Sequence, residues 1–159
     1  MSSIKFKRLA GDLKNLRKKP IEGITAEPID ENDLTLWKGR VEGAKGTPFE
    51  GGYFHFKIEI PENYPFEPPV VTMKTKVYHP NINYKTGSIC VNILKKDAWV
   101  STNSIQSVLL SLQGLLSKPN PKSPLVGEIN EVYVNDINKY NETVREWVKL
   151  YAQDPEYKE

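Results

Sequence analysis

The only cysteine of this chain, Cys90, is the residue type best suited to covalent chemistry, and its neighbours favour an exposed position. It follows a polar turn that contains Gly87 and Ser88, and the triplet His79-Pro80-Asn81 precedes that turn. A catalytic thiol must be reachable, whereas a structural cysteine is buried in apolar packing. The Asn81 amide is able to donate a hydrogen bond to an oxyanion. Two interpretations stay open, a nucleophilic thiol with an oxyanion donor and a cysteine that only fills the core.

Only two histidines, His55 and His79, are available as a general base. His79 precedes a proline in an extended turn, where we expect it to hydrogen-bond the backbone and fix the loop. His55 alternates with apolar residues, so it is expected on the solvent face of a strand. A cysteine hydrolase needs a paired histidine base. A thiol without one suits exchange between thioesters, in which one thiol replaces another with little change in energy.

The bulk composition excludes several other classes of function. One cysteine allows no internal disulfide, and no ligand cluster predicts a metal or another cofactor. With 22 basic and 20 acidic residues, the chain lacks the large positive net charge that would attract nucleic acid. No phosphate-binding glycine loop, signal peptide or membrane-spanning apolar run is present. We therefore expect a protein of the cytoplasm, with the nucleus as a further compartment, that binds neither nucleic acid nor membrane.

The elements that must position Cys90 predict an α+β fold. An N-terminal helix ends before Pro20, and basic residues surround its apolar stripe. Strands follow from alternation around Leu34 and Leu36 and over 53–60, and from the apolar run 70–73. A long loop then carries Cys90, and helices are predicted over 105–116, 129–133 and 140–151. Together these give an N-terminal helix, a four-stranded antiparallel sheet, a long active-site loop, and central and C-terminal helices.

Several segments, in this order and at this spacing, resemble the ubiquitin-conjugating enzyme family. They are Tyr64-Pro65-Phe66-Glu67-Pro68-Pro69, Tyr78-His79-Pro80-Asn81-Ile82, Gly87-Ser88-Ile89-Cys90, Ile93-Leu94, Trp99, Val108-Leu109-Leu110-Ser111-Leu112 and Pro119-Asn120-Pro121. The resemblance covers nearly the whole chain, with a catalytic domain over 1–152 and a short charged tail over 153–159.

The resemblance implies that Cys90 accepts ubiquitin from an activating enzyme as a thioester. A lysine amine of a protein substrate, or a ligase, then takes the ubiquitin. Asn81 either stabilises the tetrahedral oxyanion or orders the adjoining loop, and His79 supports Asn81. The basic first helix, through Lys5 and Arg8, docks the activating enzyme and ligases of the RING or HECT type. Phe66, Ser101 and Thr102 form the rest of the ligase surface.

Two positions depart from the family where it commonly carries carboxylates that position and deprotonate the incoming lysine. They are Asn92 and Ser123, or Lys122 in place of Ser123, depending on alignment. The usual Ser-Pro-Ala docking loop is also replaced, by Val100-Ser101-Thr102. Two alternatives stay open, a conjugating enzyme for a ubiquitin-like modifier and a non-catalytic ubiquitin-binding scaffold of the same fold. The Tyr64-Pro65 bond lies in a proline-dense turn, where either peptide isomer is compatible with the sequence.

Overall fold

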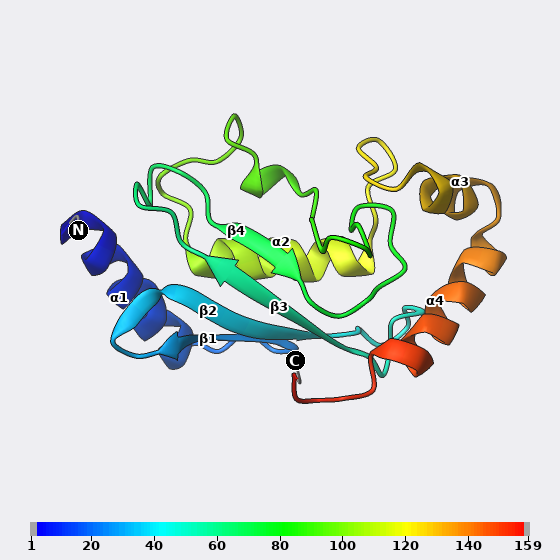
Figure 1. The fold of residues 1–159 in the computed structure, drawn as a ribbon, viewed down its shortest axis with the longest axis horizontal. Coiled ribbons are helices and arrows are strands. Elements are labelled where there is room, and N and C mark those ends of the chain that lie inside the picture. The colour runs from blue at the N-terminus through cyan, green and yellow to red at the C-terminus, as the bar shows by residue number, and fades with distance from the viewer. Residues whose placement is uncertain (1–2, 158–159) are drawn as a thin grey trace.

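The computed structural model describes residues 3–157 and confirms the predicted α+β architecture (Figure 1). The helix α1 (Ser3–Lys18) comes first and the four-stranded sheet follows it. The strands are β1 (Ile24–Asp30), β2 (Asp33–Glu42), β3 (Tyr53–Glu59) and β4 (Val70–Met73). The long loop contains one turn of 3-10 helix, η1 (Asn92–Leu94), and leads to α2 (Ile105–Ser117), α3 (Gly127–Asn135) and α4 (Ile137–Tyr151). The Tyr64-Pro65 peptide is cis.

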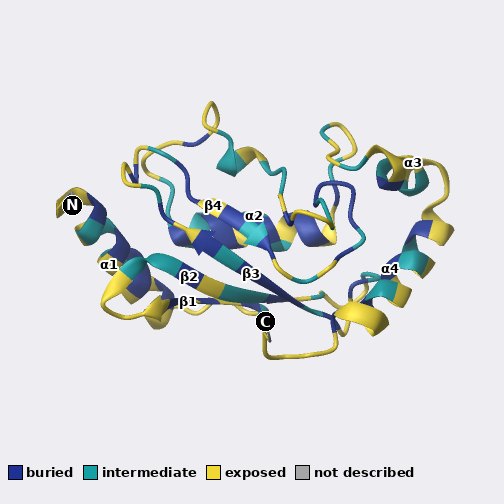
Figure 2. Ribbon diagram, viewed as in Figure 1, coloured by how far each residue is buried: buried dark blue, intermediate teal, exposed yellow. Residues whose placement is uncertain are grey.

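The sheet is an antiparallel meander in the order β1-β2-β3-β4. Its inner face packs on α2, and the buried residues of both appear dark blue in Figure 2. In β3, Phe54, Phe56 and Ile58 are buried as their alternation predicts. In β2 the buried core residues are Trp37 and Val41, whereas Leu34 and Leu36 are only partly buried. Trp37 pairs with Ile58 across the ladder, which places it on the inner face.

The outer face of the sheet is covered in part by the segment that follows α4. The Tyr53 N–H donates to the Ala152 carbonyl, and Arg40 donates through Nη1 to the Pro155 carbonyl at 2.7 Å. His55 lies on this outer face, as its strand parity predicts, but it is buried and not solvent-exposed. Its Nε2 lies 2.8 Å from the Asp154 carbonyl oxygen. The described part of the tail, residues 153–157, therefore packs on the sheet.

The helices close the two ends of the sheet (Figure 1). On α1 the stripe residues Leu9, Leu13 and Leu16 are buried against the core. At the other end α3 and α4 pack through aromatic side chains, with the Tyr133 and Tyr140 ring centroids 4.8 Å apart. Within residues 3–157, no helix is both long and apolar enough to cross a membrane, and no group of three metal-ligating side chains occurs.

Candidate active site

Cys90 lies just after a turn that the backbone fixes tightly. Asn83 donates its N–H to the Ser88 carbonyl, and Cys90 donates its own to the Asn81 carbonyl, both at 2.9 Å. Gly87 has a φ of +80° and sits so close to β4 that an added Cβ would lie 2.2 Å from the Met73 carbonyl oxygen. Only glycine fits this position. Cys90 is a partly exposed residue, and it is not among the buried core residues.

His79 is fully buried, and both of its ring nitrogens are engaged. Nε2 lies 2.8 Å from the Leu115 carbonyl oxygen, which only accepts, so this nitrogen carries the proton. Nδ1 then accepts from the Asn81 backbone N–H at 3.0 Å. Burial lowers the pKa of His79 to about 4, so the ring is neutral near pH 7. A neutral ring with no free nitrogen has no capacity to act as a base for Cys90, and this arrangement supports a structural role.

Asn81 is also buried, and its side chain ties the Cys90 segment to a loop far along the chain. The Asn81 amide nitrogen Nδ2 donates to the carbonyls of Asn120 and Ser123, both at 2.9 Å. Its Oδ1 accepts from the Asn120 N–H at 2.8 Å. Both amide hydrogens are therefore committed to loop 119–124. Of the two roles left open by the sequence, this geometry favours ordering of the loop, since an oxyanion would need one of these bonds to be released.

The two positions that lack the family's carboxylates lie on either side of this network. Asn92 is exposed at the start of η1, just beyond Cys90. Ser123 is half-buried, and its carbonyl is the one that accepts from Asn81. The loop is closed further by Leu125 and Val126, whose N–H groups both donate to the Pro80 carbonyl. Neither side chain ionises near neutral pH, so neither supplies a carboxylate to an incoming amine.

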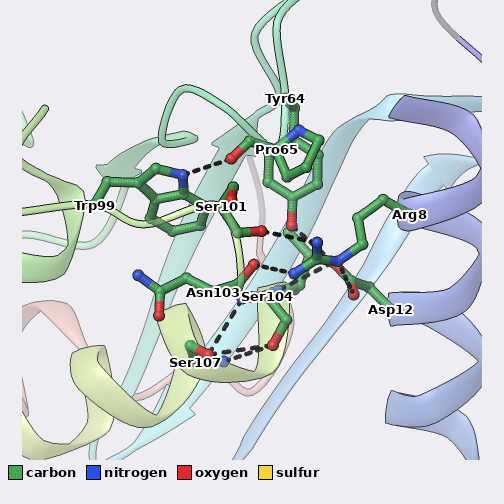
Figure 3. Close-up of polar contacts among 10 residues, drawn as sticks. Arg8, Asp12, Tyr64, Pro65, Trp99, Ser101, Asn103, Ser104 and Ser107 are labelled. Carbon is green, nitrogen blue, oxygen red and sulfur yellow. Dashed lines mark hydrogen bonds and ion pairs between the residues drawn. The ribbon is translucent and has the colours of Figure 1, made fainter. Parts of the chain in front are cut away.

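Of the predicted docking residues, Arg8 and Ser101 are joined directly by a network between α1 and the start of α2 (Figure 3). Arg8 donates through Nη1 to the Ser101 carbonyl at 2.8 Å and through Nη2 to the Asn103 carbonyl at 2.5 Å. The Trp99 indole N–H donates to the Pro65 carbonyl at 2.7 Å. These bonds join the loop around Ser101 and Thr102 both to α1 and to the turn that precedes Phe66, which is 63% exposed.

Asp12 is the centre of this network, and sequence reasoning missed it. One of its carboxylate oxygens accepts from the Tyr64 hydroxyl at 2.7 Å and from the Ile105 N–H at 3.2 Å. The other lies 3.6 Å from Nε of Arg8. Burial raises the pKa of Asp12, although the hydrogen bonds from Tyr64 and Ile105 and the Arg8 charge act in the opposite direction. The signal that could have found it is its helical spacing, one turn after Arg8 and among buried leucines.

The expectation for Lys5 was wrong in one respect. Lys5 is only 4% exposed, so it does not offer its charge to a partner on an open basic face. It lies near Asp33 of β2, whose pKa is lowered by hydrogen bonds from Thr35 and, to a smaller extent, by the Lys5 charge. The side chain is buried because it packs where α1 meets β2. Arg8 is partly exposed, and its guanidinium donates to the Ser101 and Asn103 carbonyls.

Comparisons with known proteins agree with this fold and identify the family. The family model described as ubiquitin-conjugating enzyme matches residues 8–148. A Schizosaccharomyces pombe protein named ubiquitin-conjugating enzyme E2 1 is 41% identical over 155 residues, which are 98% of this chain and 70% of that protein. The solved E2 domain of a Toxoplasma gondii ubiquitin conjugating enzyme is 34% identical with a TM-score of 0.82, covering 92% of this chain and 98% of that one.

The chain belongs to the ubiquitin-conjugating enzyme family. It is an enzyme of the transferase class that acts in ubiquitin conjugation. Membership of the family implies that its partners are ubiquitin, an activating enzyme and ligases.

Proposed function

We propose that Cys90 carries ubiquitin as a thioester. The Cys90 thiolate attacks the thioester that an activating enzyme holds with the ubiquitin C-terminus, and the activating enzyme's thiol leaves. The observation that carries this proposal is the partly exposed Cys90 at the end of a turn fixed by Gly87, beside the Asn81 network. Exchange of one thiol for another needs no strong base, which agrees with a neutral and fully bonded His79.

A charging assay tests this step. The protein is incubated with ATP, an activating enzyme and a panel of modifiers, and adducts are separated with and without thiol reductant. We expect a ubiquitin adduct that reductant cleaves, its loss in Cys90→Ala, and a reductant-stable oxyester in Cys90→Ser. Charging by a different modifier would select the ubiquitin-like alternative. No adduct with any modifier would select the scaffold, and a wild-type adduct that resists reductant contradicts the thioester.

We further propose that the charged enzyme discharges faster to a ligase cysteine than to a lysine. At pH 7.5 about a tenth of an ordinary thiol is ionised, whereas only about one lysine amine in a thousand is deprotonated. A positioned carboxylate offsets this disadvantage of the amine, and Asn92 and Ser123 supply none. Ligases with their own acceptor cysteine, the HECT type, suit this chemistry better than RING ligases, which rely on direct attack by lysine.

Single-turnover discharge of the charged enzyme to free cysteine and to free lysine tests this preference. We expect the rate of discharge to cysteine to exceed the rate of discharge to lysine when both acceptors are at the same concentration and pH. Comparable rates for the two acceptors would contradict the proposal. A HECT and a RING ligase added in separate reactions then ask whether the preference extends to protein acceptors.

A further inference from the structure

Lys76, in the segment between β4 and His79, points its ammonium group into a box of aromatic rings. The Nζ atom lies 5.7 Å from the Tyr84 ring centroid, 5.2 Å from that of Trp147 and 4.8 Å from that of Tyr151. All three distances are within the range of about 6 Å at which a cation is attracted to a ring face. We refer to Tyr84, Trp147 and Tyr151 as the aromatic cage.

The rings of the cage are arranged as walls and not as a stack. Tyr84 and Trp147 are 5.2 Å apart with an interplanar angle of 88°, and Trp147 and Tyr151 are 5.5 Å apart at 80°. Trp147 therefore stands nearly perpendicular to each of the two tyrosine rings, and the Lys76 ammonium lies within about 6 Å of all three centroids. Aromatic rings gathered around one cation are the arrangement that binds quaternary ammonium groups. The cage is open to solvent, because Lys76 is exposed and Tyr151 is 44% exposed.

We propose that the aromatic cage is a binding site for an N-methylated lysine side chain of a partner protein, and that Lys76 is its internal occupant. The seated Lys76 ammonium shows that the cage accepts an alkylammonium ion of this length and charge. Among residues 3–157, Lys76 makes no ion pair with a carboxylate and no side-chain hydrogen bond, so only the rings retain it. An exposed cation–π contact of this kind is weak, and Lys76 is therefore able to leave.

Because Lys76 is covalently attached next to the cage, a lysine from a partner protein must be methylated to compete with it. A side chain held beside its own site by a short linker has an effective concentration of about millimolar or more. An ordinary lysine from another protein offers the rings the same group and so loses to the tethered one. A trimethylated ammonium carries no N–H donors and is weakly hydrated, so it gives up less on leaving water, and its methyl groups add apolar surface for the rings to contact. Lys76 thus excludes unmodified lysines and yields to methylated ones.

The position of the cage gives such binding a consequence for the transfer reaction. Tyr84 belongs to the turn over residues 83–88 that leads directly to Cys90, and the other two rings come from α4. A partner whose methylated lysine fills the cage is held against the same turn that presents the thiol. The site itself needs no thioester, and its existence is independent of the proposed function.

Binding is measured by ¹H–¹⁵N NMR of the uncharged protein, with the indole N–H signals as reporters. Trp37 and Trp99 donate their indole N–H groups to the Leu34 and Pro65 carbonyls, so they serve as internal controls away from the cage. The probes are Nα-acetyl-trimethyllysine amide, the unmethylated lysine amide, and a neutral tert-butyl isostere. We expect only the trimethyllysine probe to shift the Trp147 signal, with Trp37 and Trp99 unchanged.

Three variants sharpen the test. Lys76→Ala removes the internal occupant and should tighten binding of the trimethyllysine probe by about two- to five-fold, the factor that corresponds to one exposed cation–π contact. Tyr151→Ala, at the exposed end of α4, should weaken it by at least as much. Lys85→Ala is the matched control, because Lys85 touches only the Tyr84 ring, at 6.0 Å, and should change nothing.

The proposal is overturned if the Trp147 signal stays unmoved in both the wild type and Lys76→Ala. It is equally overturned if the neutral isostere binds as well as the trimethyllysine probe, since apolar contact alone would then explain the effect. A gain in Lys85→Ala equal to that in Lys76→Ala would show that general surface charge, and not release of the cage, controls binding.

Discussion

Two polar networks hold distant segments together in this enzyme, one beside Cys90 and one between α1 and the start of α2. The first consists of His79 and Asn81, carries no charge and is buried, with the donors and acceptors of both side chains paired. The second consists of Arg8, Asp12 and Tyr64, and places a carboxylate in a buried position. Both networks link residues more than 30 positions apart, yet only the second leaves charge inside the protein.

The difference has opposite consequences for pH. Burial lowers the pKa of His79, so acidification protonates the unfolded chain before the native protein and lowers stability. Burial raises the pKa of Asp12, so acidification protonates the native protein before the unfolded chain. The contribution of Asp12 to the free energy of unfolding therefore rises as the pH falls. The neutral network thus fixes the loop that carries Cys90 across the neutral pH range, and the charged one keeps a buried carboxylate between α1 and α2.

The largest effect is expected from Asn81→Ala in the neutral network. The variant should charge nearly normally, but transfer to free lysine should fall by about 100- to 1000-fold if Asn81 donates to the oxyanion. Single-turnover discharge measures the rate, and NMR signals of residues 119–124 report order in the loop. Slow transfer with an ordered loop supports the donor role, and slow transfer with a disordered loop supports the role that the geometry favours. Unchanged transfer with an intact fold contradicts both.

The pH dependence of His79 should be the next largest effect. Its pKa is 6.5 in the unfolded chain and about 4 in the native protein. Above pH 6.5 its contribution to stability is complete, and it is lost between pH 6.5 and 4 at about 1.4 kcal/mol per pH unit, or about 3 kcal/mol in all. Urea denaturation of the wild type and His79→Gln should show this slope only in the wild type. NMR titration in which His79 titrates near 6.5 would contradict the mechanism.

The charged network should respond to substitution of Asp12. Asp12→Ala removes the acceptor for Tyr64 and Ile105 and should lower the free energy of unfolding by about 2 kcal/mol. Asp12→Asn keeps an acceptor and removes a charge that burial disfavours, so it should lose less than about 1 kcal/mol. Urea denaturation at pH 7 compares the pair. Equal losses in both variants would mean that the charge, and not the acceptor, holds the helices together.

The smallest effect should come from adding carboxylates at the two positions that flank the neutral network. Asn92→Asp and Ser123→Asp, singly and together, should speed discharge to free lysine by about ten-fold, below the roughly 100-fold of a well-placed general base. Charging at Cys90 should not change. The rate should rise with pH through the titration of the new carboxylate. If neither substitution alters discharge, these positions do not face the incoming amine.

The helices, the strands and their buried faces could be predicted from the sequence, but the two polar networks could not. A strand or helix that buries one face shows it as a regular spacing of apolar residues along the sequence. The alternation in β3 and the apolar stripe of α1 therefore placed Phe54, Phe56 and Leu13 in the core. The partners of Asn81 lie 39 and 42 residues away, and no periodicity encodes them. Lys5 and Asp12 look like surface residues of a polar helix, and their burial depends on β2 and α2. His55 likewise looked exposed in the sequence, and its burial depends on the distant segment 153–157 that covers it.

The bond between the Ile105 N–H and Asp12 bears on how the chain folds. Ile105 is the first residue of α2, and the carboxylate that completes its first turn comes from a residue 93 positions earlier. Closing so long a loop is entropically unfavourable until other contacts offset it, and such long-range pairings slow folding. During synthesis α1 emerges well before α2, and its buried carboxylate has no helix terminus to bind until the central helix arrives. We therefore expect the N-terminal and central segments to reach their final state together, as one cooperative unit.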